Sequence, residues 1–399
     1  MMLDRLLLVP LAVGHFALFV LVLNISHGLG HAETTLGRVK ALLLALFVAG
    51  SAILGWEIVH GSVATWSYPT LAYGTICLLT GLLLVPLFTA YLHLRARPTV
   101  FASHSEEIDL SAGPGKAALI GPGHNSWLLK LPGNESFRLR KVEWEVPIPG
   151  LPAALDGLSV LHFSDLHLAR CFRREYFEAI FDEAAALESD LHLFTGDLVD
   201  DDGAVEWVVP LMSRLKGRLG SFAVLGNHDL DHDPANLLNA LEESGYTHLE
   251  GRWSTLVIDG VAVAFAGTSY PWGPRLDPAE RPEADFSIFL SHVPDQFYWA
   301  ERHGFGLMLS GHNHGGQIRF PLVGPVVMPS VYSRRFDRGF FRLRGLTLHV
   351  SQGVGANHPV RYGCVPEIGR LVLRSVPSTE LRVTEIAGSL ARETRPGAP

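Results

Sequence analysis

Apolar and polar residues are distributed so unevenly that the chain divides into two parts. Three apolar runs lie within the first 92 residues, at 6–23, 41–59 and 71–92, and Glu57 is the only acidic residue among them. Each run is long enough to cross the hydrocarbon core of a bilayer as a helix. No cleavage site of small residues closely follows the first run, so the pattern predicts three transmembrane helices rather than a removable leader.

Basic residues beside these runs indicate how they cross the membrane. Arg38 and Lys40 lie between the first and second runs, and Arg95 and Arg97 follow the third, whereas residues 60–68 contain neither Lys nor Arg. An odd number of spans puts the first loop and the C-terminal part of the chain on the same side. The positive-inside rule predicts that this side is the cytoplasm.

Composition changes again after this membrane region, which we assign to residues 1–97. Clusters of Gly, Pro and Ser, such as SAGPGK and GPGHN, predict a linker over residues 98–139. Within it, the segment 126–137 is expected to form an edge hairpin of the following domain. That domain is expected to span residues 140–377 and the tail 378–399 to be disordered.

In the C-terminal domain, strand and helix patterns alternate before hairpins take over. Apolar residues at helical spacing predict two helices, over 177–184 and 205–212, and the Asp-Pro pair at 233–234 predicts the start of a third. Later segments read as hairpins around 259–260 and 345. Strand-helix units followed by hairpins predict an α/β fold of two packed mixed sheets with helices outside.

Five polar motifs follow five apolar runs that look like buried strands. The runs are SVLHF, LHLFT, FAVL, FSIFL and GLMLSG, and the motifs are SDLH, GDLVD, GNHD, SHVP and GHNHGGQ. Strand ends in α/β sheets open the crevice in which ligands bind. We therefore expect a common site for the metal-ligand and proton-carrier side chains of these motifs: Asp165, His167, Asp197, Asn227, His228, His292, His312 and His314.

These residue types suit two divalent cations held close together. Two cations about 3.5–4 Å apart can clamp a phosphoryl group, and a carboxylate between them offsets their repulsion. Taken alone, Asp197 or Asp229 would be read as a helix N-cap. His312 and His314 form an HxH pair that, on an extended segment, would place both rings on the same side.

The ordered motifs resemble the calcineurin-like metallophosphoesterase family, in particular its membrane-attached bacterial branch with the ending GHNHGGQ. The likeness covers about residues 140–375 and includes the flanking phrases LPAALDGLSVLHFSDLHL and RYGCVPEIGRLVL. It implies a four-layer α/β/β/α sandwich with the metals at one edge. For the membrane region, it implies a bacterial inner or plasma membrane.

The resemblance also implies a role for each motif residue. Asp165, His167 and His314 would hold the first metal, Asn227, His292 and His312 the second, and Asp197 would bridge them. His228 would face the phosphate instead of a metal. Asp200 matches a position that orients this histidine in some relatives, although Asp229 is also close in sequence.

Charge bears on the partners of this site. The formal net charge of −8 makes nucleic acid an unexpected substrate, because phosphate-backbone affinity rests on clustered Lys and Arg. One basic-aromatic stretch, residues 333–345, is either ordinary hairpin surface or a rim that binds a second phosphate or anionic headgroups. Arg361 is a candidate for anion binding or for a structural ion pair. The three cysteines have no spacing that implies a disulfide framework.

The sequence therefore predicts a membrane-anchored binuclear phosphoesterase that hydrolyses a phosphodiester or pyrophosphate, lipid-linked or not, by a metal-bridged hydroxide. Mixed oxygen and nitrogen ligands suit Mn, Fe, Zn or Co. Two alternatives are a phosphodiesterase for soluble cyclic or small nucleotides and a non-catalytic membrane sensor or scaffold. Because the apolar runs look like an anchor alone, we also expect a chain that begins near Ser126 to fold by itself.

Overall fold

Three long helical stretches form the N-terminal part of the computed structural model, which describes residues 2–60, 65–95 and 100–376. Helices α1 (Met2–Gly28) and α2 (Glu33–His60) are followed by α3 (Tyr68–Leu79), which continues through a π-helical turn (Thr80–Leu84) into α4 (Val85–Leu94). All three stretches are long and apolar enough to cross a membrane, as the apolar runs predict.

A polar contact that the sequence did not reveal ties these helices together. The ring of His15 in α1 contacts the Tyr73 hydroxyl of α3 through Nδ1 at 2.6 Å and Ser51 Oγ of α2 through Nε2 at 3.0 Å. His15 is buried among them. Hydrogen bonds between side chains of neighbouring helices are a common means of association in a bilayer, where apolar contact with lipid competes with apolar contact between helices.

The first sheet of the C-terminal domain has seven strands. Their order is β1 (Phe101–Asp109), β2 (Arg138–Pro149), β15 (Glu367–Val376), β3 (Ser159–Phe163), β4 (Leu191–Thr195), β5 (Gly220–Val224) and β6 (Thr247–His248). Strands β3 to β6 run parallel to one another. The last strand, β15, lies between β2 and β3, parallel to the former and antiparallel to the latter.

The second sheet has six strands. Their order is β13 (Gly339–Leu343), β14 (Leu346–Val350), β10 (Leu307–Ser310), β9 (Phe286–Ser291), β8 (Val261–Thr268) and β7 (Arg252–Ile258). The four central strands are parallel. At the two edges, β7 forms an antiparallel hairpin with β8, and β13 forms one with β14. A small separate hairpin pairs β11 (Arg319–Phe320) with β12 (Gly324–Pro325).

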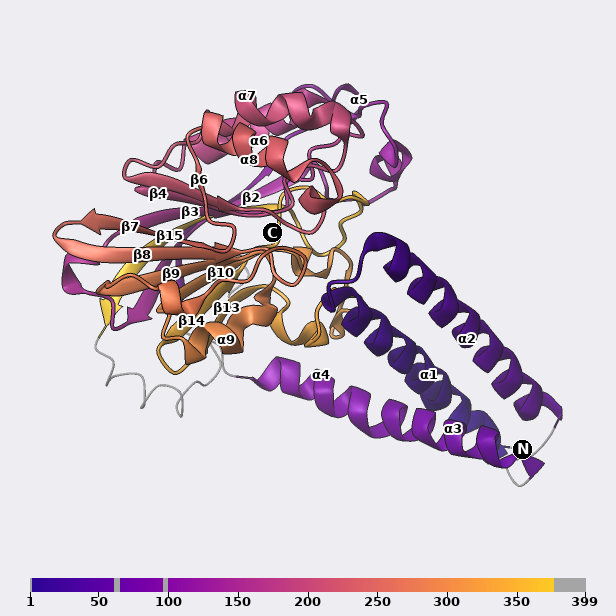
Figure 1. Ribbon diagram of the computed structural model, residues 1–399. Coiled ribbons are helices and arrows are strands. Elements are labelled where there is room, and N and C mark those ends of the chain that lie inside the picture. The colour runs from indigo at the N-terminus through magenta and orange to yellow at the C-terminus, as the bar shows by residue number, and fades with distance from the viewer. Residues whose placement is uncertain (1, 61–64, 96–99, 377–399) are drawn as a thin grey trace, which may run out of the picture.

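The two sheets pack face to face, with helices on both outer faces (Figure 1). Residues such as Val146, Leu193 and Ile288 form a fully buried core between the sheets. Helices α6 (Arg174–Ala185), α7 (Val208–Met212) and α8 (Pro234–Glu243) cover the first sheet, and α9 (Phe297–Arg302) covers the second. This arrangement confirms the expected four-layer α/β/β/α sandwich and agrees with general layer packing.

Local sequence signals account for helix α8. The side chain of Asp233 accepts a hydrogen bond from the backbone N–H of Asn236 at 3.2 Å, and Pro234 occupies the first turn. Both features favour a helix N-terminus. Leu237 and Leu241 then face the core of the first sheet.

The edge strand of the first sheet comes from a different segment than the one we expected. Residues 101–109 form β1 and pair with β2, whereas Ser126–Lys130 form a 3-10 helix. The physical reason lies in burial: Leu128 and Leu129 are buried and cannot alternate with solvent-facing residues, whereas Glu106 and Glu107 are suited to an exposed edge. The tail 378–399 lies outside the described residues.

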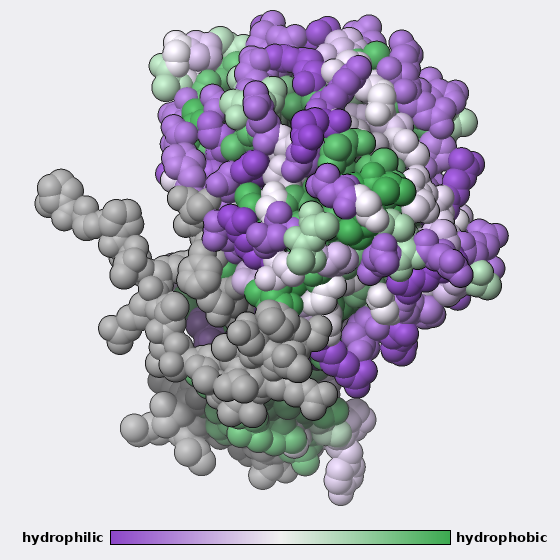
Figure 2. Space-filling view, turned by 90° about the vertical axis from the view of Figure 1, so that its left-hand side faces the viewer, coloured by the Kyte–Doolittle hydropathy of each residue, from purple (hydrophilic) through white to green (hydrophobic). Residues whose placement is uncertain are grey.

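The helices contact the sandwich directly. Asn24, buried near the end of α1, accepts from the backbone N–H of Met328 at 2.9 Å and donates to the Val326 carbonyl at 3.2 Å. Arg95, just after α4, forms a buried ion pair of 2.7 Å with Asp337. These contacts place the domain at the same end of the helices as the connection between α1 and α2, as an odd number of spans requires (Figure 1). On the face of the sandwich that is turned away from the helices, hydrophilic residues predominate (Figure 2).

Candidate metal centre

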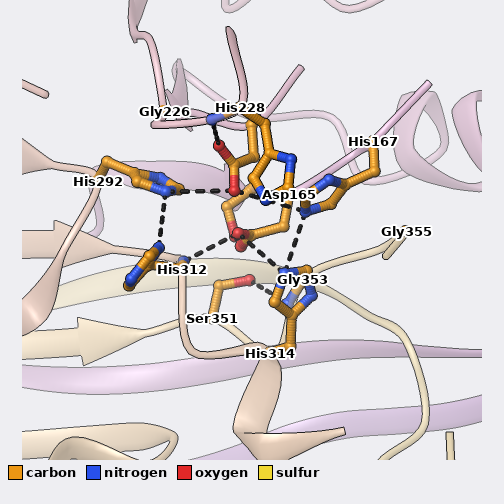
Figure 3. A network of polar contacts seen from close by, with 12 residues as sticks. Asp165, His167, Gly226, His228, His292, His312, His314, Ser351, Gly353 and Gly355 are labelled. Carbon is orange, nitrogen blue, oxygen red and sulfur yellow. Dashed lines mark hydrogen bonds and ion pairs between the residues drawn. The ribbon is translucent and has the colours of Figure 1, made fainter. Parts of the chain in front are cut away.

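Loops at the carboxyl ends of five parallel strands supply the motif residues. The first sheet contributes Asp165 and His167 after β3, Asp197 after β4, and Asn227 and His228 after β5. The second sheet contributes His292 after β9 and His312 and His314 after β10. The structure brings these eight side chains together at one edge of the sandwich, where the ends of the two sheets meet (Figure 3).

Two groups of donor atoms share the carboxylate of Asp197. One group contains Asp165, His167, Asp197 and His314, and the other contains Asp197, His292 and His312. In the close-up view, His167 and His314 lie on one side of Asp165, and His292 and His312 lie on the other (Figure 3).

Distances within these groups are short. Asp197 Oδ2 lies 3.5 Å from His167 Nε2 and 3.3 Å from His292 Nε2. The amide oxygen of Asn227 lies 3.1 Å from His292 Nε2, which places it beside the second group. The arrangement has the pattern expected of two neighbouring sites with one bridging carboxylate.

The chemistry of the donor set fits divalent cations. His167 Nδ1 contacts Asp200 Oδ2 at 2.8 Å, and His292 Nδ1 donates to the Thr195 carbonyl at 2.8 Å, so Nε2 is the ring nitrogen that each histidine directs at Asp197. Such partners fix the tautomer and orientation of metal-binding histidines. The pKa values of His312 and His314 are lowered well below the usual value by burial, so both rings are neutral and can bind a metal.

Backbone conformation at this edge is unusual. Asp165, His167, Asp197, His312 and His314 all have positive φ, between 45° and 66°. The left-handed region costs a non-glycine residue roughly 1–2 kcal/mol, and such residues cluster at functional sites. Gly226 is needed for close approach, since a Cβ there would lie 2.1 Å from Asp197 Oδ1.

The HxH pair is not extended, contrary to our expectation. His312 and His314 lie in a turn with φ of 66° and 46°, and a short 3-10 helix begins at His314. This geometry sends the two rings to different donor groups instead of to the same side. Backbone strain of this kind has no signature in residue spacing.

Asp200 connects His228 to His167, a candidate metal ligand. Its Oδ1 lies 2.8 Å from His228 Nδ1, and its Oδ2 lies 2.8 Å from His167 Nδ1. Although burial lowers the pKa of His228, the carboxylates of Asp197 and Asp200 raise it to about 10. The ring is therefore positively charged at neutral pH in the metal-free protein.

Asp229 has a structural role. Its carboxylate is fully buried and accepts from the backbone N–H groups of Leu198 at 2.7 Å, Val199 at 3.0 Å and Gly226 at 2.8 Å. These bonds tie the loop after β4 to the loop after β5. Of the two candidate aspartates, Asp200 and Asp229, Asp200 is the one that contacts the ring of His228.

The structure revises the interpretation of Arg361. Its guanidinium is buried and donates to the carbonyls of Gln352 at 2.7 Å and Gly355 at 2.6 Å, and it does not line the cavity above the candidate metal ligands. Backbone carbonyls and the ring of His314, whose Nδ1 lies 3.3 Å from the guanidinium, occupy its donors instead of a substrate anion. The burial of such a large cation cannot be seen in the sequence.

A cavity of about 720 Å³ lies over the candidate metal centre. Its lining includes His167, Asp197, Asn227 and His228, together with Trp272. The ring of Trp272 lies 5.2 Å from that of His312. No motif surrounds Trp272, so its position beside the site could not be predicted from the sequence.

The basic-aromatic stretch 333–345 contacts the helices instead of the cavity. The guanidinium of Arg334 lies 5.3 Å from the ring centre of Phe88 in α4, and that of Arg335 lies 6.0 Å from the ring of Tyr91. Neither arginine lines the cavity. Contacts of this type fasten the domain to the membrane helices.

Two packed mixed sheets with these ligand types at one edge define a metallophosphoesterase, a metal-dependent phosphoester hydrolase. Residues 158–316 match the calcineurin-like phosphoesterase family, so this part of the chain is a calcineurin-like phosphoesterase domain. The matched region contains every predicted metal ligand. The resemblance read from the motifs is thereby confirmed.

Relatives of the chain carry the same kind of domain. An uncharacterized metallophosphoesterase of Bacillus subtilis, YkuE, is 29% identical over 260 residues, which are 60% of this chain and 87% of the relative. The phosphodiesterase YaeI of Escherichia coli is 28% identical over 54% of this chain and 81% of its own length. A bovine transmembrane protein with a metallophosphoesterase domain is 28% identical over 58% of this chain and 56% of its own length.

Proposed function

We propose that the protein is a membrane-anchored phosphoesterase that uses two divalent cations to hydrolyse a phosphodiester or pyrophosphate. The observation that carries the proposal is the position of Asp197 between two donor groups. In this assignment Asp165, His167 and His314 hold one cation, and Asn227, His292 and His312 hold the other. When bound, such a pair of cations supplies an activated water and stabilises charge on the phosphoryl oxygens.

The protein's own groups then position the substrate and move a proton. His228 faces the cavity, lies 2.8 Å from the Asp200 carboxylate through Nδ1, and lies outside the two donor groups that share Asp197. It is therefore placed to donate a proton to the leaving oxygen. Trp272, beside His312, forms an apolar part of the cavity wall.

Membrane attachment favours a substrate that is linked to a lipid. The domain is held against α1 by Asn24 and against the end of α4 by Arg95, and the cavity wall includes residues from the connection between α1 and α2. We place this end of the helices in the cytoplasm because Arg38, Lys40 and Arg95 lie there. A sensor or scaffold without turnover would not need the complete donor set that the structure retains.

The proposal is tested with the full-length protein in detergent micelles. Metal is removed by chelation, Mn²⁺ or Zn²⁺ is restored, and hydrolysis is followed for p-nitrophenyl phosphate, bis(p-nitrophenyl) phosphate and a phospholipid diester. We expect metal-dependent turnover of the diesters, absent from an Asp197→Ala variant. Metal-independent turnover, or none on any of the three substrates at saturating metal, would contradict the proposal.

A further inference from the structure

The connection between α1 and α2 forms one wall of the cavity over the metal centre. His27, Gly30, His31, Ala32, Leu36 and Lys40 line the same space as His167, Asp197, Asn227 and His228. Residues separated by more than a hundred positions in sequence therefore enclose one cavity. The membrane region supplies part of the site and does not serve as an anchor alone.

This wall has a defined position relative to the domain. Gly30 has φ of +69°, and a Cβ there would lie 2.8 Å from the Pro271 ring. The neighbouring Trp272 lines the cavity as well. On the other flank, the hydrogen bonds of Asn24 to residues 326 and 328 hold the end of α1.

Charge in the cavity is divided between the metal centre and this wall. Lys40 is half-buried, and within the described part of the chain it forms no ion pair with a carboxylate. His31 is also half-buried and faces the same cavity. Three carboxylates also line the cavity: Asp197 and Asp200, which contact His292 and His167, and Asp231, which has an interaction of its own. The ammonium group of Lys40 is therefore available to pair with an anion bound in the cavity.

We propose that Lys40, assisted by His31, binds a second anionic group of the substrate while the metal centre holds the reacting phosphoryl group. The proposal rests on the proposed function, which it extends to a substrate class: phosphoesters that carry a further phosphate or carboxylate. A lipid headgroup and a soluble metabolite can both present this chemistry. An ammonium on a flexible stem suits an anion whose exact geometry varies.

A matched pair of soluble substrates isolates the second group. Thymidine 5′-(p-nitrophenyl phosphate) with and without a 3′-phosphate differ only in that anion, and both release p-nitrophenolate. We expect wild-type full-length protein to have the higher kcat/KM for the 3′-phosphorylated substrate. In a Lys40→Ala variant, the ratio of the two kcat/KM values should fall about tenfold. Lys40→Arg should retain most of it.

Arg38 provides the matched control, because it lies on the same helix two positions away and does not line the cavity. Arg38→Ala should keep the wild-type preference. An unchanged preference in Lys40→Ala, or an equal loss in both variants, would overturn the subsite. The same comparison in mixed micelles, with phospholipid diesters that have or lack a terminal phosphate, shows whether the second anion belongs to a lipid.

Failure of the proposed function would be recognised separately. If the wild-type protein hydrolyses neither thymidine substrate, binding of thymidine 3′,5′-bisphosphate and of thymidine 5′-phosphate to the Mn²⁺-loaded protein is compared by calorimetry. A preference for the bisphosphate that Lys40→Ala abolishes supports the subsite without turnover. Equal binding of the two nucleotides, or a preference that the variant retains, rejects it.

A second, independent observation concerns the surface of the β11–β12 hairpin. After residue 94, the described part of the chain exposes seven large hydrophobic side chains, and five of them lie within residues 318–327. They are Ile318, Phe320, Leu322, Val323 and Val327, with Leu322 exposed by 85%. Such a concentration of exposed apolar residues marks an interaction surface.

The position of this hairpin identifies its partner. Asn24 of α1 binds the Val326 carbonyl, and Arg334 donates to the Val323 carbonyl at 3.2 Å while it lies over Phe88 of α4. The apolar surface is therefore continuous with the membrane helices. We infer that residues 318–327 insert into the bilayer that these helices cross.

Site-specific labelling tests this insertion. Leu322→Cys and, as control, Val257→Cys are labelled with an environment-sensitive fluorophore in proteoliposomes; Val257 is 69% exposed on β7, and the native cysteines are buried. We expect blue-shifted emission at position 322 that phospholipids brominated in their acyl chains quench, and neither effect at position 257. Unshifted emission at position 322, or shifted emission without quenching, would show a water-exposed or protein-covered hairpin and overturn the inference.

Discussion

Asp200 Oδ1 lies 2.8 Å from His228 Nδ1, so a buried carboxylate holds the histidine that faces the cavity. The other oxygen of Asp200 contacts His167, a proposed metal ligand. One side chain thereby couples the orientation of the proton carrier to the orientation of a ligand. Loss of the proton carrier and loss of a metal ligand should therefore differ in their effects on kcat and on metal content.

Loss of His228 should separate metal binding from chemistry. In His228→Ala, kcat should fall by about 10²-fold to 10⁴-fold, the usual contribution of a positioned proton carrier. Metal content, measured by elemental analysis, should stay at the wild-type value. The control is His232→Ala, since His232 lines the same cavity but pairs with Asp202. A metal loss in His228→Ala would reassign His228 as a ligand.

The pH profile should report on Asp200. Because the carboxylates of Asp197 and Asp200 raise the pKa of His228, its proton is present at low pH and is lost as pH rises through that pKa. The alkaline limb of kcat should therefore move to lower pH in Asp200→Asn and disappear in His228→Ala. An alkaline limb that stays in place in Asp200→Asn would show that Asp200 does not sustain the charge on His228.

Metal stoichiometry should depend on the shared carboxylate. Wild-type protein saturated with Mn²⁺ should contain two metals per chain, and Asp197→Ala should lose at least one of them together with activity. Asp233→Ala, which removes a helix cap on the surface, serves as the control and should keep both metals. A single metal in the saturated wild type would refute the binuclear assignment.

Arg361 should matter for stability. Its replacement by Met leaves the carbonyls of Gln352 and Gly355 buried without donors, at about 1–3 kcal/mol for each group. Thermal unfolding of the solubilised protein should shift to lower temperature, and Arg361→Lys should recover little because one ammonium cannot reproduce the planar fork. Arg344→Met, at a residue whose side chain is 79% exposed, should have almost no effect. Wild-type stability with weakened substrate binding would restore the anion-binding role.

Truncation should now give a result that differs from our sequence-based expectation. A chain that begins at Ser126 lacks β1 and exposes the edge of β2, whereas one that begins at Val100 keeps this strand pair. We expect the longer chain to fold and the shorter one to aggregate, as measured by light scattering after expression. Equal solubility of both would show that β1 contributes little.

The sequence predicted those parts of the fold that have a local signal. The five apolar runs before the motifs all form strands, β3, β4, β5, β9 and β10, because a buried strand needs apolar residues on both faces. Asp233 with Pro234 located the start of α8 for an equally local reason. The ligand types followed from the chemistry of the motifs.

Features that depend on distant segments could not be predicted in this way. The position of β15 between β2 and β3 cannot be predicted from the composition of these three strands. Lys40 lies in the cavity wall, and Arg361 is buried away from the cavity. Both positions result from contacts between residues far apart in the chain. The left-handed conformations of His312 and His314 are imposed by the packed loops around them.

The place of β15 has a consequence for biosynthesis. Among the strands that the structure describes, β15 is the last to leave the ribosome, yet within the described residues it alone links the β1–β2 pair to β3 and β4, the strands that precede Asp165 and Asp197. By then the helices and every metal-binding motif have already been made. The nascent chain must keep the open edges of β2 and β3 apart from other chains until residues 367–376 have been made, and a message truncated before residue 367 would yield all the proposed ligands on a sheet in two halves.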